Sequence, residues 1–534
     1  MKKVRASSEI LDYHHKSAKR KNNPEEGLAI YLPEEKASQK YSYDPHLDPQ
    51  LVWSGKGERA SFDVPVVPLH IHERVSPRSI VGALEKKRSH QLRLFDETNF
   101  PLDKRVDFYK HDIDWANRLI LGDSLLVMNS LLTKEFMAGK VQMIYIDPPY
   151  GINYTSNFQA SIRGKMRDAD DNSLTREVEQ IRAYRDTWSL GIHSYLTYLR
   201  DRFLLAHELL NESGSLFVQI SDENVHLIRN LLDEIFLKEN FVSLITFRKK
   251  GMPLGSSTLE RMSDYLVWYA KDISRVKYRK LFTQKDVQGA SRWNYVDLPD
   301  GSWRFMTSEE WHNHSLLPKN VRIFTSRALK PSGYSKSMDF IVEFQGKKYN
   351  PPYGGCWMTT PEGMQKLIET NRIIVENNSL RAKLYLNDYP VSELTNLWDD
   401  TSGASDKMYV VQTMEKVIQR CILMSTDPGD LVFDPTCGSG TTAYSAEQWG
   451  RRWITCDTSR IALAIAKQRL MTAVFPYYVL AQPQEGIRSG FVYKTVPHVT
   501  LSSIIQSETP FSLSFLPFGN ITPPFWIASI RVET

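Results

Sequence analysis

Residues 431–442 read LVFDPTCGSGTT, a pattern of strand, turn and helix that indicates an α/β fold. The apolar run ends at Asp434, the turn carries Gly438 and Gly440, and a helical pattern follows. Glycine in such a turn lets backbone N–H groups come close to a ligand. No lysine follows these glycines, and Ala443 stands where a third glycine would complete a dinucleotide fingerprint. The loop therefore predicts neither a nucleotide triphosphatase nor a complete dinucleotide motif.

An acidic residue follows the next predicted strand. The apolar residues 453–456 end at Asp457. A carboxylate in this position can accept hydrogen bonds from both hydroxyls of a ribose. The glycine turn alone is equally well explained as an ordinary tight turn, but together with Asp457 it favours a site for a nucleoside cofactor.

A second apolar strand, residues 141–146, ends in the corner Asp147-Pro148-Pro149-Tyr150. Ligands of open α/β sheets bind at the carboxyl ends of the strands. The prolines stiffen the corner and lack an N–H, so their carbonyl oxygens are available as acceptors. Asp147 and the Pro148 carbonyl can accept the two N–H groups of an exocyclic amine, and Tyr150 can stack on its ring, which suits a base that has left its stack. A strand-ending turn with a surface tyrosine is the alternative for the tetrapeptide alone.

Two motifs in a particular order carry a family resemblance: IYIDPPYG (144–151) precedes FDPTCGSGTT (433–442). They resemble the DNA amino-methyltransferases that use S-adenosyl-L-methionine, and their order is similar to that of the β class, which includes the modification subunits of type III restriction systems. The resemblance covers about residues 110–480. It implies a Rossmann-like methyltransferase sheet with helices on both faces, an inserted target-recognition region, and methylation of adenine N6 in DNA. Cytosine N4 is the less favoured target, because the motif begins with aspartate rather than serine.

The resemblance also implies roles at the DPPY corner. Asp147 and the Pro148 carbonyl hold the target amino group, Pro149 belongs to the same corner, and Tyr150 stacks on the flipped base. Hydrogen bonds to Asp147 and Pro148 would localise the nitrogen lone pair, so that the methyl group transfers in line without a covalent intermediate.

The cofactor roles implied by the resemblance lie mainly in the glycine loop. The methionine end is lined by the loop, the ribose is bound by Asp457, and Asp123 resembles the acid near the cofactor adenine, although a helix N-cap explains Asp123 equally well. A further stretch before the loop departs from the family's common His-Pro-Thr-Gln-Lys-Pro form. The loop residues are Asp434, Pro435, Gly438 and Gly440, and those of the further stretch are Lys407, Gln412 and Thr413.

The chain of 534 residues divides into five predicted segments. Residues 1–105 are a polar, partly ordered extension, 106–270 and 401–480 form the catalytic domain, 271–400 form the target-recognition region, and 481–534 form a C-terminal tail. Strand–helix alternation stops in the irregular region 271–400, where cations and aromatic residues mix, which favours DNA binding over an ordinary charged surface. The predicted strands are 118–121, 141–146, 214–220, 241–247, 265–269, 431–433 and 453–456, and the predicted helices are 124–132, 193–212, 223–236, 410–424, 441–450 and 460–471.

The composition narrows the class of protein. Lys and Arg number 67 against 62 Asp and Glu, a formal net charge of +5, which permits nucleic-acid binding without requiring it. Four cysteines without a C-x-x-C pair predict neither a disulfide scaffold nor a metal site, and we interpret them as packing residues. The basic N-terminus is not followed by an apolar run, so we expect no signal peptide. Because we also find no apolar stretch of membrane-spanning length, we expect a cytoplasmic protein.

The expected partner is double-stranded DNA. A separate restriction or helicase subunit is expected if the protein belongs to a restriction or phage-defence system, because no nuclease or helicase motif is found, and a homodimer stays open. The alternatives are cytosine N4 methylation, methylation of RNA or of a protein amide nitrogen, and an inactive specificity subunit. Intact Asp147, Tyr150, Asp434 and Asp457 argue against an inactive subunit.

Overall fold

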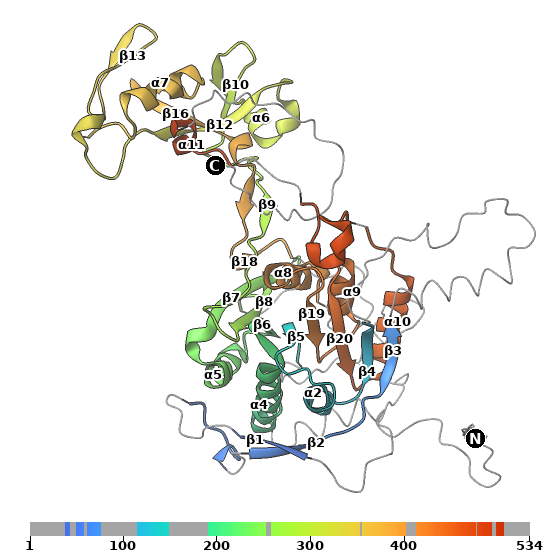
Figure 1. Ribbon diagram of the computed structural model, residues 1–534. Coiled ribbons are helices and arrows are strands. Elements are labelled where there is room, and N and C mark those ends of the chain that lie inside the picture. Colours follow the sequence, from blue (N-terminus) through green and yellow to red (C-terminus); the bar gives the residue numbers. More distant parts are fainter. Residues whose placement is uncertain are drawn as a thin grey trace, which may run out of the picture. The chain divides into compact units, whose positions relative to one another are not determined.

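The computed structural model describes residues 38–42, 50–57, 61–75, 115–148, 191–252, 258–352, 355–401, 413–476, 478–493 and 498–506. The chain divides into two compact units (Figure 1). The first unit joins Met1–Tyr278 to Asn396–Phe491, and the second joins Arg279–Thr395 to Val492–Thr534. In this division the second unit starts at Arg279, whereas the predicted insert starts at residue 271, and the described residues 498–506 belong to the second unit.

A nine-stranded sheet is the framework of the first unit (Figure 1). Its strands are β3 Ile71–Val75, β4 Asn117–Leu121, β5 Val141–Ile146, β6 Leu210–Ile220, β7 Phe241–Arg248, β8 Ser263–Ala270, β18 Leu397–Trp398, β19 Leu431–Asp434 and β20 Arg452–Asp457. They lie in the order β18-β7-β8-β6-β5-β19-β20-β4-β3. The strands β19 and β20, which follow the insert, thus lie between β5 and β4, which precede it, so two distant stretches of sequence build one sheet.

Most of this sheet is parallel, as the sequence predicts. The strands β4, β20, β19, β5 and β6 form a continuous parallel block. The strand β8 runs antiparallel to both β6 and β7, and the edge strand β3 runs antiparallel to β4. Every residue of β5 is buried, which is typical of a parallel strand that is covered on both faces.

Three helices cover one face of the sheet, and each packs against the next one along the chain. The helix α2 (Ser124–Thr133) contacts α4 (Ile192–Leu209), and α4 contacts α5 (Val225–Phe236). The buried side chains of α4 recur at helical spacing, as in Leu199, Phe203 and Ala206. The sequence pattern predicts these helices because it places one apolar side of each against the sheet.

The opposite face carries α8 (Glu415–Ser425), α9 (Thr441–Gln448) and α10 (Arg460–Thr472), of which α9 contacts both others. Helices on both faces of a largely parallel sheet confirm the predicted Rossmann-like α/β class. The start of α8 differs from the prediction of residue 410, because Met414 is extended and caps the helix. None of the described helices is long and apolar enough to cross a membrane.

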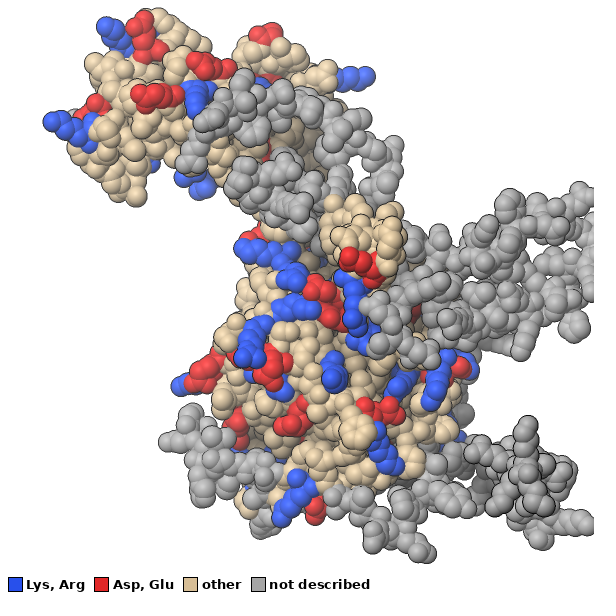
Figure 2. All heavy atoms as spheres, viewed as in Figure 1, with Lys and Arg blue, Asp and Glu red and all other residues tan. Residues whose placement is uncertain are grey.

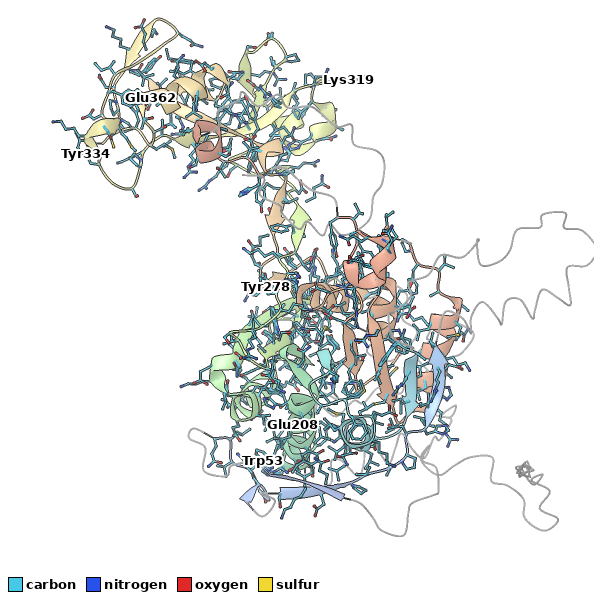
Figure 3. The ribbon with its side chains drawn as sticks, viewed as in Figure 1. Trp53, Glu208, Tyr278, Lys319, Tyr334 and Glu362 are labelled. Carbon is cyan, nitrogen blue, oxygen red and sulfur yellow. The ribbon has the colours of Figure 1, made fainter. Side chains whose placement is uncertain are left out.

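Parts of the predicted N-terminal extension pack against helices of the first unit, to which they belong. The strands β1 (Ser38–Ser42) and β2 (Ser61–Pro65) pair antiparallel. Between them Trp53, which is labelled in Figure 3, is buried and donates its indole N–H to the Thr197 hydroxyl at 3.0 Å. The Lys56 ammonium lies 2.7 Å from the Glu234 carboxylate of α5. The extension therefore contacts α4 through the Trp53 hydrogen bond and α5 through the ion pair of Lys56 with Glu234.

The second unit contains a five-stranded antiparallel sheet in the order β11-β10-β12-β16-β15, which the sequence analysis did not predict. Because β10 and β11 have three residues each, they are too short to show an alternating pattern. The helix α7 (Pro361–Glu369) packs with α11 (Leu501–Gln506) from the C-terminal segment. The strands are β10 Tyr295–Asp297, β11 Trp303–Phe305, β12 Arg322–Ala328, β15 Ile373–Glu376 and β16 Ser379–Tyr385.

Candidate active site

Strand register brings the two sequence motifs to one edge of the sheet. The strand β19 runs parallel to β5 on one side, where Phe433 pairs with Ile144, and to β20 on the other, where Asp434 pairs with Thr455. Parallel strands end at the same edge, so the corner after β5, the glycine loop after β19 and the acid that ends β20 leave the sheet side by side.

A hydroxyl group joins the corner to the glycine loop. The backbone N–H of Asp147 donates to Thr436 Oγ1 at 2.9 Å. The Thr436 hydroxyl and backbone N–H donate in turn to Asp434 Oδ1 at 3.0 and 2.8 Å. Thr436 therefore connects the backbone of the predicted amine-binding Asp147 with the carboxylate of Asp434. This role of Thr436 was not predicted, although Thr436 lies within the quoted loop.

Asp434 is a buried acid whose pKa is shifted. Its side chain is buried at the end of β19. Burial raises the pKa of this carboxyl from its ordinary value of 3.8 to about 6, even though hydrogen bonds from Thr442 and Thr436 favour the ionised form. A cation bound beside Asp434 would offset this cost of burial, so the carboxylate suits a ligand with a positive group.

Both glycines of the loop have a positive φ, +51° at Gly438 and +74° at Gly440. Gly440 also caps α9, and a Cβ atom at this position would lie 2.7 Å from the Ala466 Cβ of α10. The approach of a ligand is the reason for these glycines that the sequence predicts. At Gly440 the structure adds a second reason, which is the close packing of α10 on the loop.

Asp457 holds the loop from the neighbouring strand. Its Oδ2 accepts the backbone N–H of Gly438 at 2.9 Å, and its Oδ1 accepts that of Ser459 at 2.8 Å. Burial raises the pKa of Asp457 as well, against the effect of these backbone donors. A carboxylate has about four acceptor positions, so these two bonds are compatible with the predicted contact to a ribose hydroxyl.

Asp123 lies next to this cluster, because the N–H of Gly122 donates to the Asp457 carbonyl at 3.0 Å. Its Oδ1 caps α2 by accepting the N–H of Leu125 at 2.9 Å, and its Oδ2 lies 2.7 Å from the Arg202 guanidinium. The structure thus shows the helix N-cap that the sequence analysis offered as the alternative. The cofactor role of Asp123 stays a prediction.

A cluster of polar side chains surrounds the carboxylate of Asp147. Thr413 Oγ1 donates to Asp147 Oδ2 at 3.3 Å, and Gln219 Nε2 donates to Thr413 Oγ1 at 2.8 Å. The hydroxyl of Tyr145 donates to Gln219 Oε1 at 2.5 Å. Gln219 is not among the residues predicted from the sequence, where its signal is a single amide in the run GSLFVQI. Thr413 was predicted to contact the cofactor.

Several predicted site residues lie outside the described residues: Pro149, Tyr150, Lys407 and Gln412. The predicted stacking on a flipped base therefore stays a prediction. Pro148 is described and buried at the corner. The carbonyl of Pro435 accepts a hydrogen bond from Cys456 Sγ at 3.6 Å inside the loop.

All four cysteines are buried as free thiols. Burial raises the pKa of Cys421, Cys437 and Cys456 well above the ordinary range. A neutral thiol is a poor nucleophile, so these three side chains fit the packing role that the sequence analysis gave them.

Comparison with known proteins gives a family match that spans both motifs. The N6/N4 methyltransferase family model, described as DNA methylase, matches residues 141–468. The type II methyltransferase M.EcaI of Enterobacter cloacae is 26% identical over 66% of this chain and 69% of its own length. The Mod subunit of the type III enzyme EcoPI of Escherichia phage P1 is 32% identical over 77% of this chain and 66% of its own length.

Some relatives are matched over only about half of their own length. This chain spans 49% of the Mod subunit of the type III enzyme StyLTI of Salmonella typhimurium, at 24% identity over 62% of this chain. Among solved structures, an M1.HpyAVI–SAM complex aligns with a TM-score of 0.29 and 14% identity over 66% of this chain and 98% of that one. The strand order of this chain, rather than that alignment, defines its fold. Since the family model matches more than half of the residues, the chain belongs to the N6/N4 DNA methylase family.

Proposed function

We propose that the protein methylates the N6 atom of adenine in duplex DNA with S-adenosyl-L-methionine, as part of a restriction-modification system. The observation that supports this most is the hydrogen bond between the Asp147 N–H and Thr436 Oγ1. It sets an acceptor corner for an exocyclic amine directly beside a loop suited to a nucleoside cofactor. The family membership and the names of the relatives support the same reaction class.

The donors and acceptors at this edge fit S-adenosyl-L-methionine. The buried Asp434 carboxylate suits the ammonium of the methionine end, and Asp457 suits the ribose hydroxyls. The backbone of the loop at Gly438 and Gly440 comes close to this space without a side chain. When bound, the cofactor supplies an electrophilic methyl group on a sulfonium.

The corner residues prepare the nucleophile. The N6 lone pair of adenine is delocalised into the ring, which makes the amine weakly nucleophilic. Asp147 and the Pro148 carbonyl would accept its two N–H groups and thereby localise the lone pair on nitrogen. With the amine held in this way, its nitrogen would accept the methyl group that bound S-adenosyl-L-methionine supplies, S-adenosyl-L-homocysteine would be the leaving group, and the surplus proton would pass from the nitrogen to solvent. The chain contributes positioning and electrostatics, so no covalent intermediate is needed.

The second unit is our candidate for target recognition. Residues 279–395 hold 16 Lys and Arg against 12 Asp and Glu, which is most of the excess positive charge of the chain. Some of the acids are used internally, as Asp297 is by Lys383 and Arg322. On the face shown in Figure 2, cationic and anionic side chains are interspersed over the described surface, so on this face we expect phosphate contacts at separate points rather than along one basic stripe.

The partner that we propose is a separate restriction subunit. Two of the relatives reported above are Mod subunits of type III restriction-modification enzymes, whereas M.EcaI is a type II methyltransferase. A chain that acts without a restriction subunit is therefore the second candidate. We also propose a cytoplasmic location, where the host DNA of such systems is found, and we leave the homodimer as a further proposal.

One experiment identifies the product. The full chain is incubated with unmethylated duplex DNA and methyl-labelled S-adenosyl-L-methionine, and the DNA is digested to nucleosides. We expect label in N6-methyldeoxyadenosine. Label in N4-methyldeoxycytidine would move the target to cytosine, and label that enters only RNA or protein would refute DNA as the substrate. Excess unlabelled cofactor and a heat-treated sample are the controls.

A further inference from the structure

We propose that Tyr145, Gln219 and Thr413 form a hydrogen-bonded relay that orients the Asp147 carboxylate toward the target amine. Thr413 is then a positioning residue for methyl transfer. Its place in the sequence had instead predicted a contact with the cofactor. This inference rests on the proposed function of Asp147, and it adds three residues to the corner.

The relay starts from two neighbouring strands. Tyr145 of β5 and Gln219 of β6 are almost completely buried, with 1% and 3% of their surface exposed. In the parallel register Tyr145 pairs with Phe217, so Asp147 lies level with Gln219 at the end of the two strands. Thr413 reaches the same place from the segment that leads into α8, and α8 contacts both strands.

The direction of the hydrogen bonds follows from Tyr145. Burial raises the pKa of its phenol well above the ordinary value, so the hydroxyl stays protonated and acts as a donor. Its partner at 2.5 Å must then be the Gln219 oxygen, which turns the amide nitrogen toward Thr413 at 2.8 Å. The Thr413 hydroxyl proton has two acceptors within reach, this oxygen at 3.1 Å and Asp147 Oδ2 at 3.3 Å. The Gln219 oxygen already accepts from Tyr145, and a carboxylate is the stronger acceptor, which favours Asp147.

The last step reaches the carboxylate. With the Gln219 nitrogen donating to its oxygen, the Thr413 hydroxyl directs its proton to Asp147 Oδ2 at 3.3 Å. A donor on a carboxylate favours the ionised, accepting form and fixes the plane of the group. The same residue is held from the other side by its own N–H on Thr436. Backbone and side chain of Asp147 are thus fixed by different partners.

The alternative is that the buried Gln219 amide only pairs the hydrogen-bonding groups around it and has no effect on catalysis. It predicts that loss of a hydroxyl lowers stability but leaves the turnover of the folded enzyme unchanged. The relay predicts instead a loss of kcat at unchanged affinity for the cofactor. A third possibility, that Thr413 contacts the cofactor, predicts a raised KM for S-adenosyl-L-methionine at unchanged kcat.

The test compares two substitutions at one position. We expect Thr413→Val to lower kcat for methyl transfer to duplex DNA about tenfold, with the dissociation constant of S-adenosyl-L-methionine within about twofold of wild type. Thr413→Ser keeps the hydroxyl and should restore most of the rate. Thermal unfolding of each variant shows that the compared proteins are folded.

A second variant tests the far end of the relay. Tyr145→Phe removes the donor that orients Gln219, and we expect a fall in kcat of about threefold. Combined with Thr413→Val it should cause little additional loss, because both changes act on one chain of contacts. The matched control is Tyr269→Phe, which removes another buried hydroxyl, 2.5 Å from Asp233, away from the corner. That variant should keep the kcat of wild type.

The outcomes separate this inference from the proposed function. A wild-type protein that transfers no methyl group to DNA would overturn both. If the wild type is active and Asp147→Ala is inactive while Thr413→Val turns over at the wild-type rate, the relay alone is wrong. A raised KM for the cofactor with unchanged kcat would also overturn it, by placing Thr413 on the cofactor.

Discussion

The backbone N–H of Asp147 donates to Thr436 Oγ1 at 2.9 Å, which joins two motifs that lie almost 300 positions apart in the sequence. The contact exists because β19 lies beside β5 in the sheet. The same hydroxyl donates to Asp434, so the corner and the cofactor loop share one hydrogen-bonding group. A methyl transfer in line requires donor and acceptor to be held at a fixed separation, and this bridge supplies such a constraint.

The bridge predicts an effect of Thr436→Val. The substitution removes the acceptor of the Asp147 N–H and a donor to the Asp434 carboxylate in one step. We expect a loss of about 1–3 kcal/mol in the free energy of unfolding, measured with denaturant, and a fall in kcat. Thr436→Ser keeps the hydroxyl and is the matched control. Equal stability and rate of the valine variant and wild type would show that the bridge has no energetic role.

The raised pKa of Asp434 predicts a pH-dependent affinity for the cofactor. The carboxyl titrates near 6 in the protein without ligand, and only the ionised form attracts the cofactor ammonium. The dissociation constant of S-adenosyl-L-methionine should therefore stay flat above pH 7 and rise as the pH falls through about 6, approaching about tenfold per pH unit in more acid solution. Calorimetric titration over this range measures it. In Asp434→Asn the affinity should be weak and nearly independent of pH. A flat curve for wild type would contradict this prediction.

The raised pKa of Asp434 affects stability in the opposite direction: affinity for the cofactor rises with pH, whereas the stability of the fold falls. A carboxyl whose pKa is raised on folding stabilises the folded state below its unfolded value of 3.8, and this contribution is lost as the pH rises through about 6. As the pH rises from 3.8 to about 6, the unfolding free energy of wild type should therefore fall relative to that of Asp434→Asn. Denaturant unfolding of both proteins at several pH values measures the difference, and a constant difference would contradict the burial of an ionisable Asp434.

The glycine loop predicts a strong effect of Gly440→Ala. The new methyl group would meet Ala466 at 2.7 Å while the backbone keeps a φ of +74°. We expect a loss of more than about 2 kcal/mol in unfolding free energy and weaker cofactor binding. Gly139→Ala is the control, because Gly139 has a φ of +65° with nothing within 4 Å of an added Cβ. If both variants lose the same stability, the contact with α10 is not the reason for Gly440.

The buried ion pair of the second unit allows the two units to be tested separately. Lys383 and Asp297 are each 1% exposed, and their charged groups lie 2.8 Å apart. We expect Lys383→Met to destabilise the second unit by about 3–5 kcal/mol, because Asp297 loses one of its cations. Thermal unfolding should show this loss, while affinity for the cofactor stays at the wild-type value. A parallel loss of cofactor affinity would mean that the first unit depends on the second.

The sequence predicted the elements of the first unit well, because long apolar runs such as those of β5 and β19 allow few alternatives. It also brought Asp147 and Asp434 to one edge of one sheet, since both follow strands of a parallel sheet. The contacts of Thr436 and Gln219 could not be predicted from the sequence. They depend on strand register and on side-chain direction, which no single motif contains.

Two further features of the fold escaped prediction for physical reasons. The antiparallel sheet of the second unit is built partly from strands of three residues, which are too short to show a period of two. The C-terminal helix α11 joins α7 through contacts such as Lys366 Nζ to the Ile505 carbonyl at 2.8 Å. Such a contact between distant segments leaves no local trace in the sequence.

The most direct test of the central claim is a single-turnover measurement on Asp147→Ala. The claim is that the corner of Asp147 holds the target amine while the neighbouring loop holds the cofactor. Wild type should form N6-methyldeoxyadenosine in duplex DNA from bound S-adenosyl-L-methionine, and Asp147→Ala should form none while it binds the cofactor with the wild-type dissociation constant. A variant that still methylates DNA at the wild-type rate, or one that loses the cofactor instead of the transfer step, would contradict it.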